Sequence, residues 1–236
     1  MSSEQPSATT TTQSHLDLFL CEQHPTVGLQ ILDGVSIGVP DGAVTGLIGP
    51  NGAGKTTVFN LISRIYQPTT GTLSFEGQPL DALAPHAIAA RGIARTFQNI
   101  ELFEHATLLQ NLLLARHAHK KSNFWSELLF TPATRRMEIE HREAVEHVID
   151  FLDLQQYRDS YIVNLPYGVR KVTELARALC TNPKLLLLDE PSSGLNVEET
   201  EDMAFWIQDI KNLLGITVLM VEHDMSLVSE IGRAHV

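Results

Sequence analysis

The sequence predicts an α/β domain built on a parallel sheet, and three observations support this fold class. Residues 49–57 read GPNGAGKTT, fit the pattern G-x-x-x-x-G-K-[ST], and directly follow an apolar run at residues 44–48. Two later apolar runs, at residues 185–188 and 216–221, each end in a polar cluster that contains acids. Between these runs and the loop, apolar residues recur with helical spacing. Parallel strands covered on both faces read as such apolar runs, and ligands bind beyond their carboxyl ends.

The composition is that of an ordinary globular protein. The chain has 236 residues, 43% of them hydrophobic, which suffices for one large domain or a domain with an insertion. A formal net charge of −11 argues against broad binding of nucleic acid or of an anionic membrane. No apolar stretch approaches the length that spans a bilayer, so we expect any membrane connection to run through a partner. Cys21 and Cys180 are far apart, so we expect two buried or inert thiols in a reducing cytosol.

The first forty residues predict a disordered tail followed by a small antiparallel sheet. Residues 1–14 are rich in Ser and Thr and have almost no large apolar side chain, which is typical of disorder. From residue 15 to residue 40, short apolar stretches alternate with turn residues, a pattern that indicates short strands. Residues 73–77 add a hairpin edge whose turn falls at Glu76 and Gly77.

The glycine-rich stretch predicts a phosphate-binding loop, with a helix that continues over residues 57–65. Glycines allow the backbone to close around a phosphate chain with several N–H groups directed inward, and a helix N-terminus favours an anion. We expect Lys55 to reach the outer phosphates and the Thr56 hydroxyl to bind Mg²⁺. The alternative is a glycine-rich turn that fits the pattern by accident, but the strand before it and the helix after it favour a phosphate site. The predicted contacts are Gly49, Pro50, Asn51, Gly52, Ala53, Gly54, Lys55, Thr56 and Thr57.

Residues from about 100 to 180 predict a helical subdomain inserted into the α/β domain. A strand at residues 92–97 precedes it and delivers Gln98 at its end. Within the insertion, one helix has a charged face and an apolar face. The apolar face comprises Val145, Val148, Ile149 and Leu152.

The last third of the chain predicts a strand, a helix and a second strand. A buried strand at residues 185–188 comes first, followed by an amphipathic helix over residues 197–214 that Gly215 stops. A buried strand at residues 216–221 then ends in a polar cluster that includes His223. We expect the inward face of the helix to comprise Met203, Trp206, Ile207, Ile210, Leu213 and Leu214.

Two adjacent acids follow the strand at residues 185–188. A carboxylate that follows four leucines at a strand end can hold Mg²⁺ directly or through water, so Asp189 is the predicted metal ligand. Taken alone, Asp189 is explained equally well as an acid that starts a turn before Pro191, and it is the phosphate loop that favours the metal site. Glu190, one residue further, is placed to orient a water for attack on the γ-phosphate.

Six segments in this order resemble the motifs of ABC transporter ATP-binding subunits, over about residues 28–230. They are GPNGAGKTT, TFQN with Gln98, LPYGVRK at residues 165–171, LLLLDEP at residues 185–191, SGLN at residues 193–196 and VEHD with His223. The resemblance implies an α/β ATPase domain of the P-loop NTPase type with an antiparallel β subdomain and an inserted helical subdomain. It also implies that the nucleotide is ATP, that Mg²⁺ accompanies it, and that the chain hydrolyses ATP.

The resemblance also implies roles for residues outside the phosphate loop. Gln98 would sense the metal and the γ-phosphate and link the site to a membrane partner. His223 would contact the γ-phosphate and the attacking water, and residues 193–196 would lie across a dimer interface. The implied catalytic set is Glu190, His223 and Gln98, and the implied metal set is Thr56, Gln98 and Asp189.

The signature segment departs from the L-S-G-G-Q that is usual in the family. Pro166 removes a hydroxyl and a backbone N–H that would otherwise face the γ-phosphate of the nucleotide on the opposite subunit. Gly168 and the following helix N-terminus can still present N–H groups to that phosphate. We therefore expect a changed contact and an unchanged fold. The implied nucleotide contacts of this segment are Leu165, Pro166, Tyr167 and Gly168.

Within the family, residues 94–117 most closely resemble the subunits of branched-chain amino-acid importers. Importers of urea or short amides share much of this pattern, so the substrate class stays open between them. The resemblance implies a homodimer, or a heterodimer with a sister ATPase subunit, docked on integral membrane permease subunits at the cytoplasmic face of the cell membrane. A periplasmic or extracellular substrate-binding protein would act indirectly, and no nucleic-acid partner is expected.

Two alternative functions stay open from the sequence. One is a soluble ABC-type ATPase of DNA repair or translation, although such proteins carry long coiled coils or a second ATPase domain that this sequence lacks. The other is a regulatory nucleotide-binding subunit with weak turnover, which Pro166 motivates. Glu190 and His223 are both present, which argues against it.

The end of the chain differs from the family pattern. Family members usually continue with a further strand and hairpin after the His-bearing strand, whereas this sequence stops shortly after Leu227. Residues 231–236, IGRAHV, resemble a translated sequencing-adapter read. We expect them to be a non-native tail on a truncated fragment, and we expect the ATPase domain to span residues 15–230.

Overall fold

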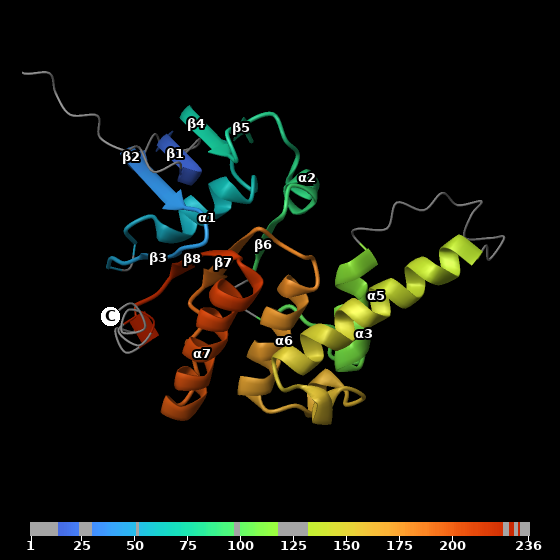
Figure 1. The fold of residues 1–236 in the computed structure, drawn as a ribbon. Helices are drawn as coiled ribbons and strands as arrows, with labels where there is room; N and C mark the ends of the chain where they lie inside the picture. The colour runs from blue at the N-terminus through green and yellow to red at the C-terminus, as the bar shows by residue number, and fades with distance from the viewer. Residues whose placement is uncertain are drawn as a thin grey trace, which may run out of the picture.

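The computed structural model describes residues 14–23, 30–50, 52–96, 100–117, 132–223, 227–228 and 231. Its strands form two sheets, one antiparallel with the order β2-β1-β4-β5 and one parallel with the order β3-β8-β7-β6. Figure 1 shows the antiparallel sheet and α1 on one side of the parallel sheet, α6 and α7 on its other side, and α3 and α5 beside α6. This arrangement is the predicted α/β domain with an antiparallel subdomain and a helical subdomain.

The antiparallel sheet is formed by the N-terminal strands and the predicted hairpin. Its turn lies at Glu76 and Gly77, whose φ angles of 51° and 70° suit a tight two-residue hairpin loop. β1 begins at Ser14, the last residue of the predicted tail, and residues 1–13 lie outside the described part. The strands are β1 (Ser14–Gln23), β2 (Gln30–Pro40), β4 (Thr70–Phe75) and β5 (Gln78–Pro79).

The parallel sheet is buried on both faces because its central strands alternate between two hydrophobic clusters. On β7 (Leu185–Asp189), Leu185 and Leu187 pack with α1 and the antiparallel sheet, whereas Leu186 and Leu188 pack with the helices of the other face. Every residue of β7 and of β8 (Thr217–Val221) is buried. The prediction of two buried strands is therefore confirmed. β6 (Ile93–Arg95) is shorter than the predicted strand at residues 92–97, and Phe97 lies outside the described residues.

The strand before the phosphate loop is less buried than the sequence predicts. Within the described part of the sheet, β3 (Val44–Leu47) pairs with β8 on one side only, so it is an edge strand there. Its side chains are half-buried or exposed, and Ile48, which follows it, is 55% exposed. An apolar run does not distinguish a central strand from an edge strand, which has one neighbour fewer to cover it.

Two helices that flank the sheet show how well the ends of elements can be predicted. α1 (Lys55–Ile62) ends before the predicted residue 65 because the chain turns at Arg64, whose φ is 59°. α7 (Val197–Leu214) has the predicted bounds, with a reciprocal capping box between Asn196 and Glu199 and Gly215 in the left-handed conformation at its end.

The inward face of α7 differs from the prediction at its last turn. Met203, Ile207 and Ile210 are buried at helical spacing, and Trp206 packs partly against the same cluster. Leu213 is 70% exposed and Leu214 is also exposed, so these two assignments are wrong. Leu213 falls outside the stripe set by the three buried residues, and within the described ranges the last turn of the helix is left largely uncovered.

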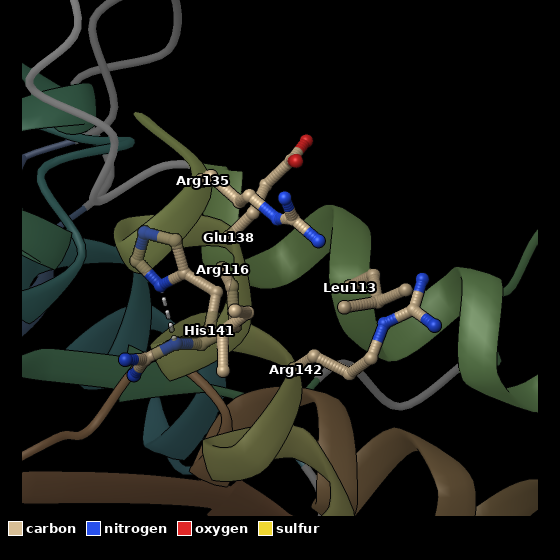
Figure 2. Close-up of a pocket in the computed structure, with 7 residues that line it drawn as sticks. Leu113, Arg116, Arg135, Glu138, His141 and Arg142 are labelled. Carbon is tan, nitrogen blue, oxygen red and sulfur yellow. Dashed lines mark hydrogen bonds between the residues drawn. The ribbon is translucent and has the colours of Figure 1, made fainter. Parts of the chain in front are cut away.

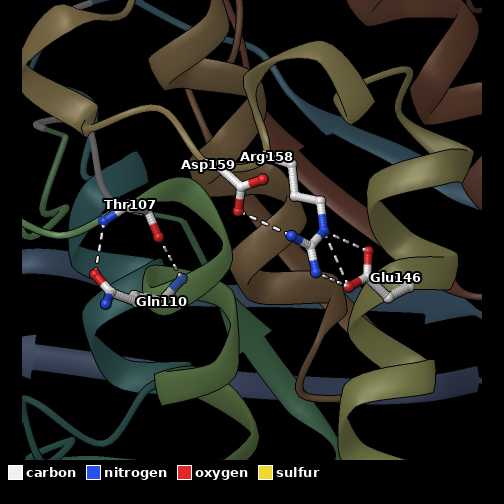
Figure 3. A network of polar contacts seen from close by, with 5 residues as sticks. All are labelled: Thr107, Gln110, Glu146, Arg158 and Asp159. Atoms are coloured by element: carbon white, nitrogen blue, oxygen red, sulfur yellow. Dashed lines mark hydrogen bonds and ion pairs between the residues drawn. The ribbon is translucent and has the colours of Figure 1, made fainter.

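The helical subdomain is held by polar contacts at its base as well as by its core (Figure 3). Thr107 caps α3 reciprocally with Gln110: Thr107 Oγ1 accepts from the Gln110 N–H at 3.2 Å, and Gln110 Oε1 accepts from the Thr107 N–H at 2.9 Å. Arg158 donates to Glu146 and to Asp159.

The apolar face predicted for the helix of this subdomain is confirmed. Val145, Ile149 and Leu152 are buried, and Val148 packs partly against the core. The elements are α3 (Leu108–His117), α5 (Pro132–Phe151), η1 (Gln155–Tyr157), η2 (Ile162–Asn164) and α6 (Tyr167–Leu179).

Cys180, at the end of α6, is a buried free thiol. Burial raises the pKa of this thiol to about 12, with Arg116 acting in the opposite direction, so the thiol is protonated at neutral pH and poorly reactive. This confirms the expectation for Cys180, whereas the side chain of Cys21 lies outside the described part.

Near the end of the chain, Leu227 and Ile231 belong to the same hydrophobic cluster as the buried residues of α6 and α7. Within the described ranges, none of the helices combines the length and apolar character that crossing a bilayer requires.

Candidate functional site

Three parallel strands end side by side, and the predicted site residues follow those ends. β8 lies between β3 and β7, with Leu47 and Asp189 each paired to Val221. The phosphate loop follows β3, and His223 lies just beyond β8. Of the two acids, Asp189 is the last residue of β7 and Glu190 is the next residue. Neighbouring strands are about 5 Å apart, so these segments gather at one edge of the sheet.

The loop between β3 and α1 has the backbone shape of an anion cradle. Gly52 and Gly54 have φ angles of 83° and 84°, in the left-handed region that glycine adopts without strain. Among the residues described here, no side chain caps the N-terminus of α1, and its first turn holds no acid. The first N–H groups of α1 are therefore available to an anion. Asn51 lies outside the described residues.

Lys55 is folded back onto this loop. Its Nζ donates to the carbonyl oxygens of Gly49 at 2.6 Å and Pro50 at 2.8 Å. Anionic phosphate oxygens accept hydrogen bonds more strongly than neutral carbonyls, so an ammonium group held this way suits a phosphate chain. Thr56 is exposed in the first turn of α1, beside the same opening.

Asp189 and Thr56 fit a magnesium ion that is shared with a nucleotide. Where the structure describes the chain, no three His, Cys, Asp or Glu side chains gather as a metal cage. Mg²⁺ seldom needs one, because it binds through one or two carboxylates together with phosphate oxygens and water. Asp189 is 3% exposed and its Oδ2 accepts a hydrogen bond from Arg95 Nη2 at 2.9 Å. A carboxylate has about four acceptor positions, so this ion pair leaves capacity for a metal.

Glu190 follows Asp189 in a different environment. Its φ is 50°, a left-handed conformation that a non-glycine residue rarely adopts, and its N–H donates to the Val221 carbonyl at 2.9 Å. Its side chain is 18% exposed, and Oε1 lies 3.8 Å from Nδ1 of His223. Backbone strain of this kind concentrates at functional sites. The structure therefore brings the two predicted catalytic residues together on an open side of the site.

A buried carboxylate behind His223 organises this region. Glu222 is fully buried, and its Oε2 accepts from the backbone N–H of Ser192 at 3.3 Å and from its hydroxyl at 2.9 Å. Its Oε1 accepts from the His223 N–H at 2.9 Å. Glu222 thus joins the turn after the acid pair to the end of β8.

Lys171 of α6 also reaches these acids. Its Nζ donates to the backbone carbonyl of Glu190 at 3.4 Å. Burial lowers the pKa of Lys171, and four carboxylates act in the opposite direction. They belong to Glu174, Glu190, Glu222 and Asp189.

The signature segment packs against the loop at residues 193–196 of the same chain. Pro166 is the N-cap of α6, and Tyr167 Oη donates to the Ser193 carbonyl at 3.2 Å. A Cβ added to Gly168 would lie 2.2 Å from Oε1 of Glu199, so a larger residue here would displace the Glu199 side chain at the start of α7. Leu165 is buried, whereas Pro166 and Tyr167 are exposed. The segment is separate from the phosphate loop in sequence and belongs to the other face of the sheet.

Gln98, which the sequence assigns to both the catalytic and the metal set, lies outside the described residues. The strand that leads to it, β6, is next to β7, with Arg95 paired to Leu187. The backbone is described up to Thr96, whose N–H donates to the Leu187 carbonyl at 2.9 Å.

With this geometry in hand, the comparison with protein families identifies the chain. Residues 32–193, more than half of its length, match the family model described as ABC transporter. The chain belongs to the ABC transporter family. It is a nucleotide-binding ATPase subunit of the P-loop NTPase fold, as the ordered motifs predict.

Curated relatives and solved structures support this assignment over most of the cassette. The chain is 43% identical over 205 residues to the high-affinity branched-chain amino acid transport ATP-binding protein BraF of Pseudomonas aeruginosa, covering 87% of this chain and 80% of BraF. It is 40% identical, with the same coverage, to the corresponding protein LivG of Salmonella typhimurium. A nucleotide-free ATP-binding cassette from an ABC transporter gives a TM-score of 0.78 at 30% identity, covering 93% of this chain and 85% of that one. A cassette in its ADP conformation gives 0.77 at 30% identity, covering 92% and 84%.

Two hollows of the cassette lie outside the phosphate site. One, of about 390 Å³, lies between α3 and α5, and Figure 2 shows its cationic lining, in which Arg116 Nε donates to His141 Nδ1 at 3.3 Å. The other is a mostly apolar groove of about 440 Å³ between α1, α2 and β6 on one side and α3 and α6 on the other. The described residues of the phosphate loop line neither hollow.

Sequence reasoning missed four polar residues of the site. Arg95, Lys171, Ser192 and Glu222 are buried or nearly so, and each contacts one of the predicted catalytic or metal residues or its neighbours. Arg95 had a usable signal, since it is a charged residue beside a motif in a stretch that is otherwise apolar or small. Lys171 had none of this kind, because Arg170 and Glu174 are charged residues of the same stretch. Ser192 and Glu222 gave none, because either could be solvated in a turn.

Proposed function

We propose that this chain is the ATP-hydrolysing subunit of an importer for branched-chain amino acids, working with Mg²⁺ through a membrane permease. The observation that carries the substrate class is the 43% identity to BraF over 87% of this chain. An ATPase subunit does not touch the transported solute, so the relatives are the source of this inference. The chemistry rests on the phosphate loop, the acid pair and His223, which follow three adjacent strand ends.

The phosphate loop binds the phosphate chain of ATP in this proposal. Lys55 exchanges its two carbonyl acceptors for phosphate oxygens, and the N–H groups at the start of α1 donate to the same chain. Gly52 and Gly54 allow the backbone to approach closely, because neither has a side chain in the left-handed region. The contacts extend over Gly49, Pro50, Asn51, Gly52, Ala53, Gly54, Lys55, Thr56 and Thr57.

The metal is held by Thr56, Asp189 and Gln98 in this proposal. Bound Mg²⁺ would neutralise charge on the phosphate oxygens and orient the γ-phosphate. Asp189 lies on the face of the sheet that carries α1, the helix on which Thr56 sits. The two ligands therefore approach the phosphates from neighbouring elements.

Hydrolysis depends on Glu190 and His223. Glu190 accepts a proton from the attacking water, and its position next to a metal ligand brings it close to the γ-phosphate. His223, 57% exposed and 3.8 Å from Glu190, contacts the γ-phosphate and fixes the orientation of the water. The presence of both groups in contact favours an active ATPase over a weakly hydrolysing regulatory subunit.

The second half of each ATP site comes from another copy or a sister subunit. The segment Leu165, Pro166, Tyr167 and Gly168 is directed across the interface and presents the start of α6 to the nucleotide on the opposite chain. Support comes from the N-terminus of α6, where neither a side-chain cap nor a first-turn acid occurs among the described residues. Pro166 supplies neither a hydroxyl nor an N–H, so Tyr167 and Gly168 carry the polar contact.

The apolar groove beside β6 receives the permease. Three of its lining residues are large apolar side chains left about half exposed, namely Ile65, Phe103 and Leu114. Exposed apolar surface of this kind marks an interaction site. We place the subunit on the cytoplasmic face of the membrane through this contact, with a substrate-binding protein acting indirectly on the permease.

The phosphate assignment is tested with Lys55→Ala. ATP affinity should fall at least about tenfold, because a charge-assisted hydrogen bond is lost, and isothermal titration with ATP measures it. Lys184→Ala is the matched control, since Lys184 is an exposed lysine paired with Glu76 away from the loop. Near-normal ATP affinity in Lys55→Ala would reject the phosphate assignment.

The transport assignment needs the assembled complex. The chain would be co-purified with the permease subunits of its own organism and reconstituted in vesicles with the matching substrate-binding protein. Leucine, isoleucine or valine should raise ATP hydrolysis, whereas urea should not. Stimulation by urea or a short amide, with leucine inactive, would reject the branched-chain substrate class and leave the ATPase assignment intact.

A further inference from the structure

The side chain of Arg95 is a cation buried between the metal ligand and the phosphate-loop helix. It ends β6, and its side chain is 9% exposed. Arg95 and Ile93 share one face of β6, and Ile93 packs into the cluster that contains α1. The guanidinium therefore lies on the α1 face of the sheet, the same face as the side chain of Asp189.

The guanidinium group joins β7 to α1 through separate nitrogens. Nη2 donates to Asp189 Oδ2 at 2.9 Å, at the end of β7. Nη1 donates to Asn60 Oδ1 at 2.7 Å and, more weakly, to Ser63 Oγ at 3.5 Å. Its Cζ lies 5.4 Å from the centroid of the Phe59 ring. Three of these four partners belong to α1 or its C-cap.

This arrangement fixes the guanidinium rather than leaving it free to move away. A planar guanidinium group has few alternative positions when both of its terminal nitrogens are hydrogen-bonded and it stacks on an aromatic ring. Burying an arginine is unfavourable unless the charge is paired, and Asp189 supplies that pairing. The position of Asp189 is consequently tied to the body of α1.

We propose that Arg95 is a positioning residue that holds Asp189 relative to α1 and thereby sets the Mg²⁺ affinity of the ATP complex. The proposal rests on the proposed role of Asp189 as a metal ligand. α1 carries Thr56 in its first turn and Asn60 and Ser63 further along, so the Arg95 bridge fixes the spacing between both metal ligands. Mg²⁺ demands a nearly ideal octahedral arrangement, and loss of a residue that orients a ligand typically lowers metal affinity about 10–100-fold.

The test is a Mg²⁺ titration of ATP-dependent thermal stabilisation, with the full chain and with Arg95→Met. Methionine keeps an apolar side chain next to Phe59 and removes the guanidinium group. The Mg²⁺ concentration at half-maximal stabilisation should rise roughly tenfold or more. ATP binding in EDTA should stay close to the wild-type value, which a merely structural defect would not allow.

Three variants make the result specific. Arg91→Met removes an exposed arginine of the same region, which donates to Gln78, and should leave the midpoint unchanged. Arg95→Lys keeps a positive charge near Asp189, but a single ammonium group cannot bridge Asp189 and Asn60 as the guanidinium does. Its Mg²⁺ midpoint should therefore lie between those of wild type and Arg95→Met. Asp189→Asn should lose most of the Mg²⁺ dependence.

The outcomes separate this inference from the metal assignment beneath it. If Asp189→Asn shifts the midpoint and Arg95→Met does not, the positioning role is wrong and the metal assignment stands. If Asp189→Asn causes no shift, both are wrong. Equal losses of ATP affinity with and without Mg²⁺ in Arg95→Met also overturn the positioning role. Should Arg95→Met not fold, Arg95→Lys decides, and an unchanged midpoint in that variant rejects the proposal.

Discussion

The two acids at the end of β7 belong to two clusters with opposite character. The arginine cluster comprises Asp189, Arg95, Phe59, Asn60 and Ser63, and it is closed, with Asp189 3% exposed and held at 2.9 Å. The histidine cluster comprises Glu190, His223, Glu222 and Ser192, and it is open on the side of His223, which is 57% exposed and 3.8 Å from Glu190, above a fully buried Glu222. Although they are adjacent in sequence, Asp189 thus lies in a rigid environment and Glu190 in a more adjustable one.

The difference indicates how one strand end can serve two purposes. Successive residues of a strand point to opposite faces, so Asp189 is directed to α1 while Glu190, with its left-handed backbone, turns toward the end of β8. A metal ligand benefits from a fixed position, whereas a base and its partner need access to water and to the γ-phosphate. If the two clusters work independently, a substitution in one should leave the property set by the other unchanged.

The largest effect is expected in the histidine cluster from Glu190→Gln. Removal of a general base lowers the turnover about 10²–10⁴-fold, while ATP binding is retained. Steady-state ATP hydrolysis by the reconstituted transporter measures it, with Glu198→Gln, an exposed acid in the first turn of α7, as the control. Unchanged turnover would show that Glu190 is not the base.

A smaller effect is expected from His223→Ala. The loss of a hydrogen bond to a charged group should lower turnover about 10–100-fold, with little change in the affinity for ATP. Separate measurements of kcat and KM for ATP make the distinction. A rise in KM alone would mean that His223 binds the ground state, and the histidine cluster would then lack a catalytic partner for Glu190.

Ser192→Ala examines what holds the histidine cluster together. The variant removes the hydroxyl donor at 2.9 Å from the fully buried Glu222 carboxylate, so the free energy of unfolding should fall by about 1–3 kcal/mol. Denaturant unfolding measures this change. Ser193→Ala, at a less buried position of the same turn, is the control, and equal stabilities of the two variants would contradict the proposed support.

The smallest effect concerns a pair outside both clusters, Glu146 and Arg158. The hydrogen bond from Arg158 lowers the pKa of Glu146 below its ordinary value of 4.5. A lowered pKa stabilises the fold above about pH 5, and the contribution is lost as the pH falls through the folded-state pKa. Both side chains are about one-third exposed, so Glu146→Gln should lower stability by at most about 1 kcal/mol.

This pair also serves as a control for the comparison. The difference in the free energy of unfolding between wild type and Glu146→Gln should be smaller at pH 3 than at pH 7. ATP turnover at pH 7 should be unaffected. A pH-independent difference would mean that packing, not the ion pair, accounts for the effect.

The sequence was most informative where local chemistry decides the structure. The bounds of α7 follow from the capping box at Asn196 and the left-handed Gly215, and β7 and β8 follow from apolar runs that are buried on both faces. The same reasoning failed for Ile48 and Leu213, because exposure there depends on which element lies alongside. Periodicity predicts which residues share a face but not whether a neighbour covers it.

The candidate site was predictable in its motifs and not in its internal bonds. Asp189 and Glu190 stand out after four leucines, yet nothing in that stretch separates a closed environment from an open one. The separation comes from Arg95, 94 residues away in sequence, and from Glu222, 30 residues from Ser192. Contacts at such separations are set by the order of the strands, which no local pattern encodes.

The most direct test of the account is the Mg²⁺ dependence of ATP binding, measured side by side in Glu190→Gln and Asp189→Asn. If the two clusters are independent, Glu190→Gln keeps the wild-type Mg²⁺ midpoint and Asp189→Asn loses the dependence. Equal shifts in both variants would contradict the division between a closed metal-binding cluster and an open hydrolytic one.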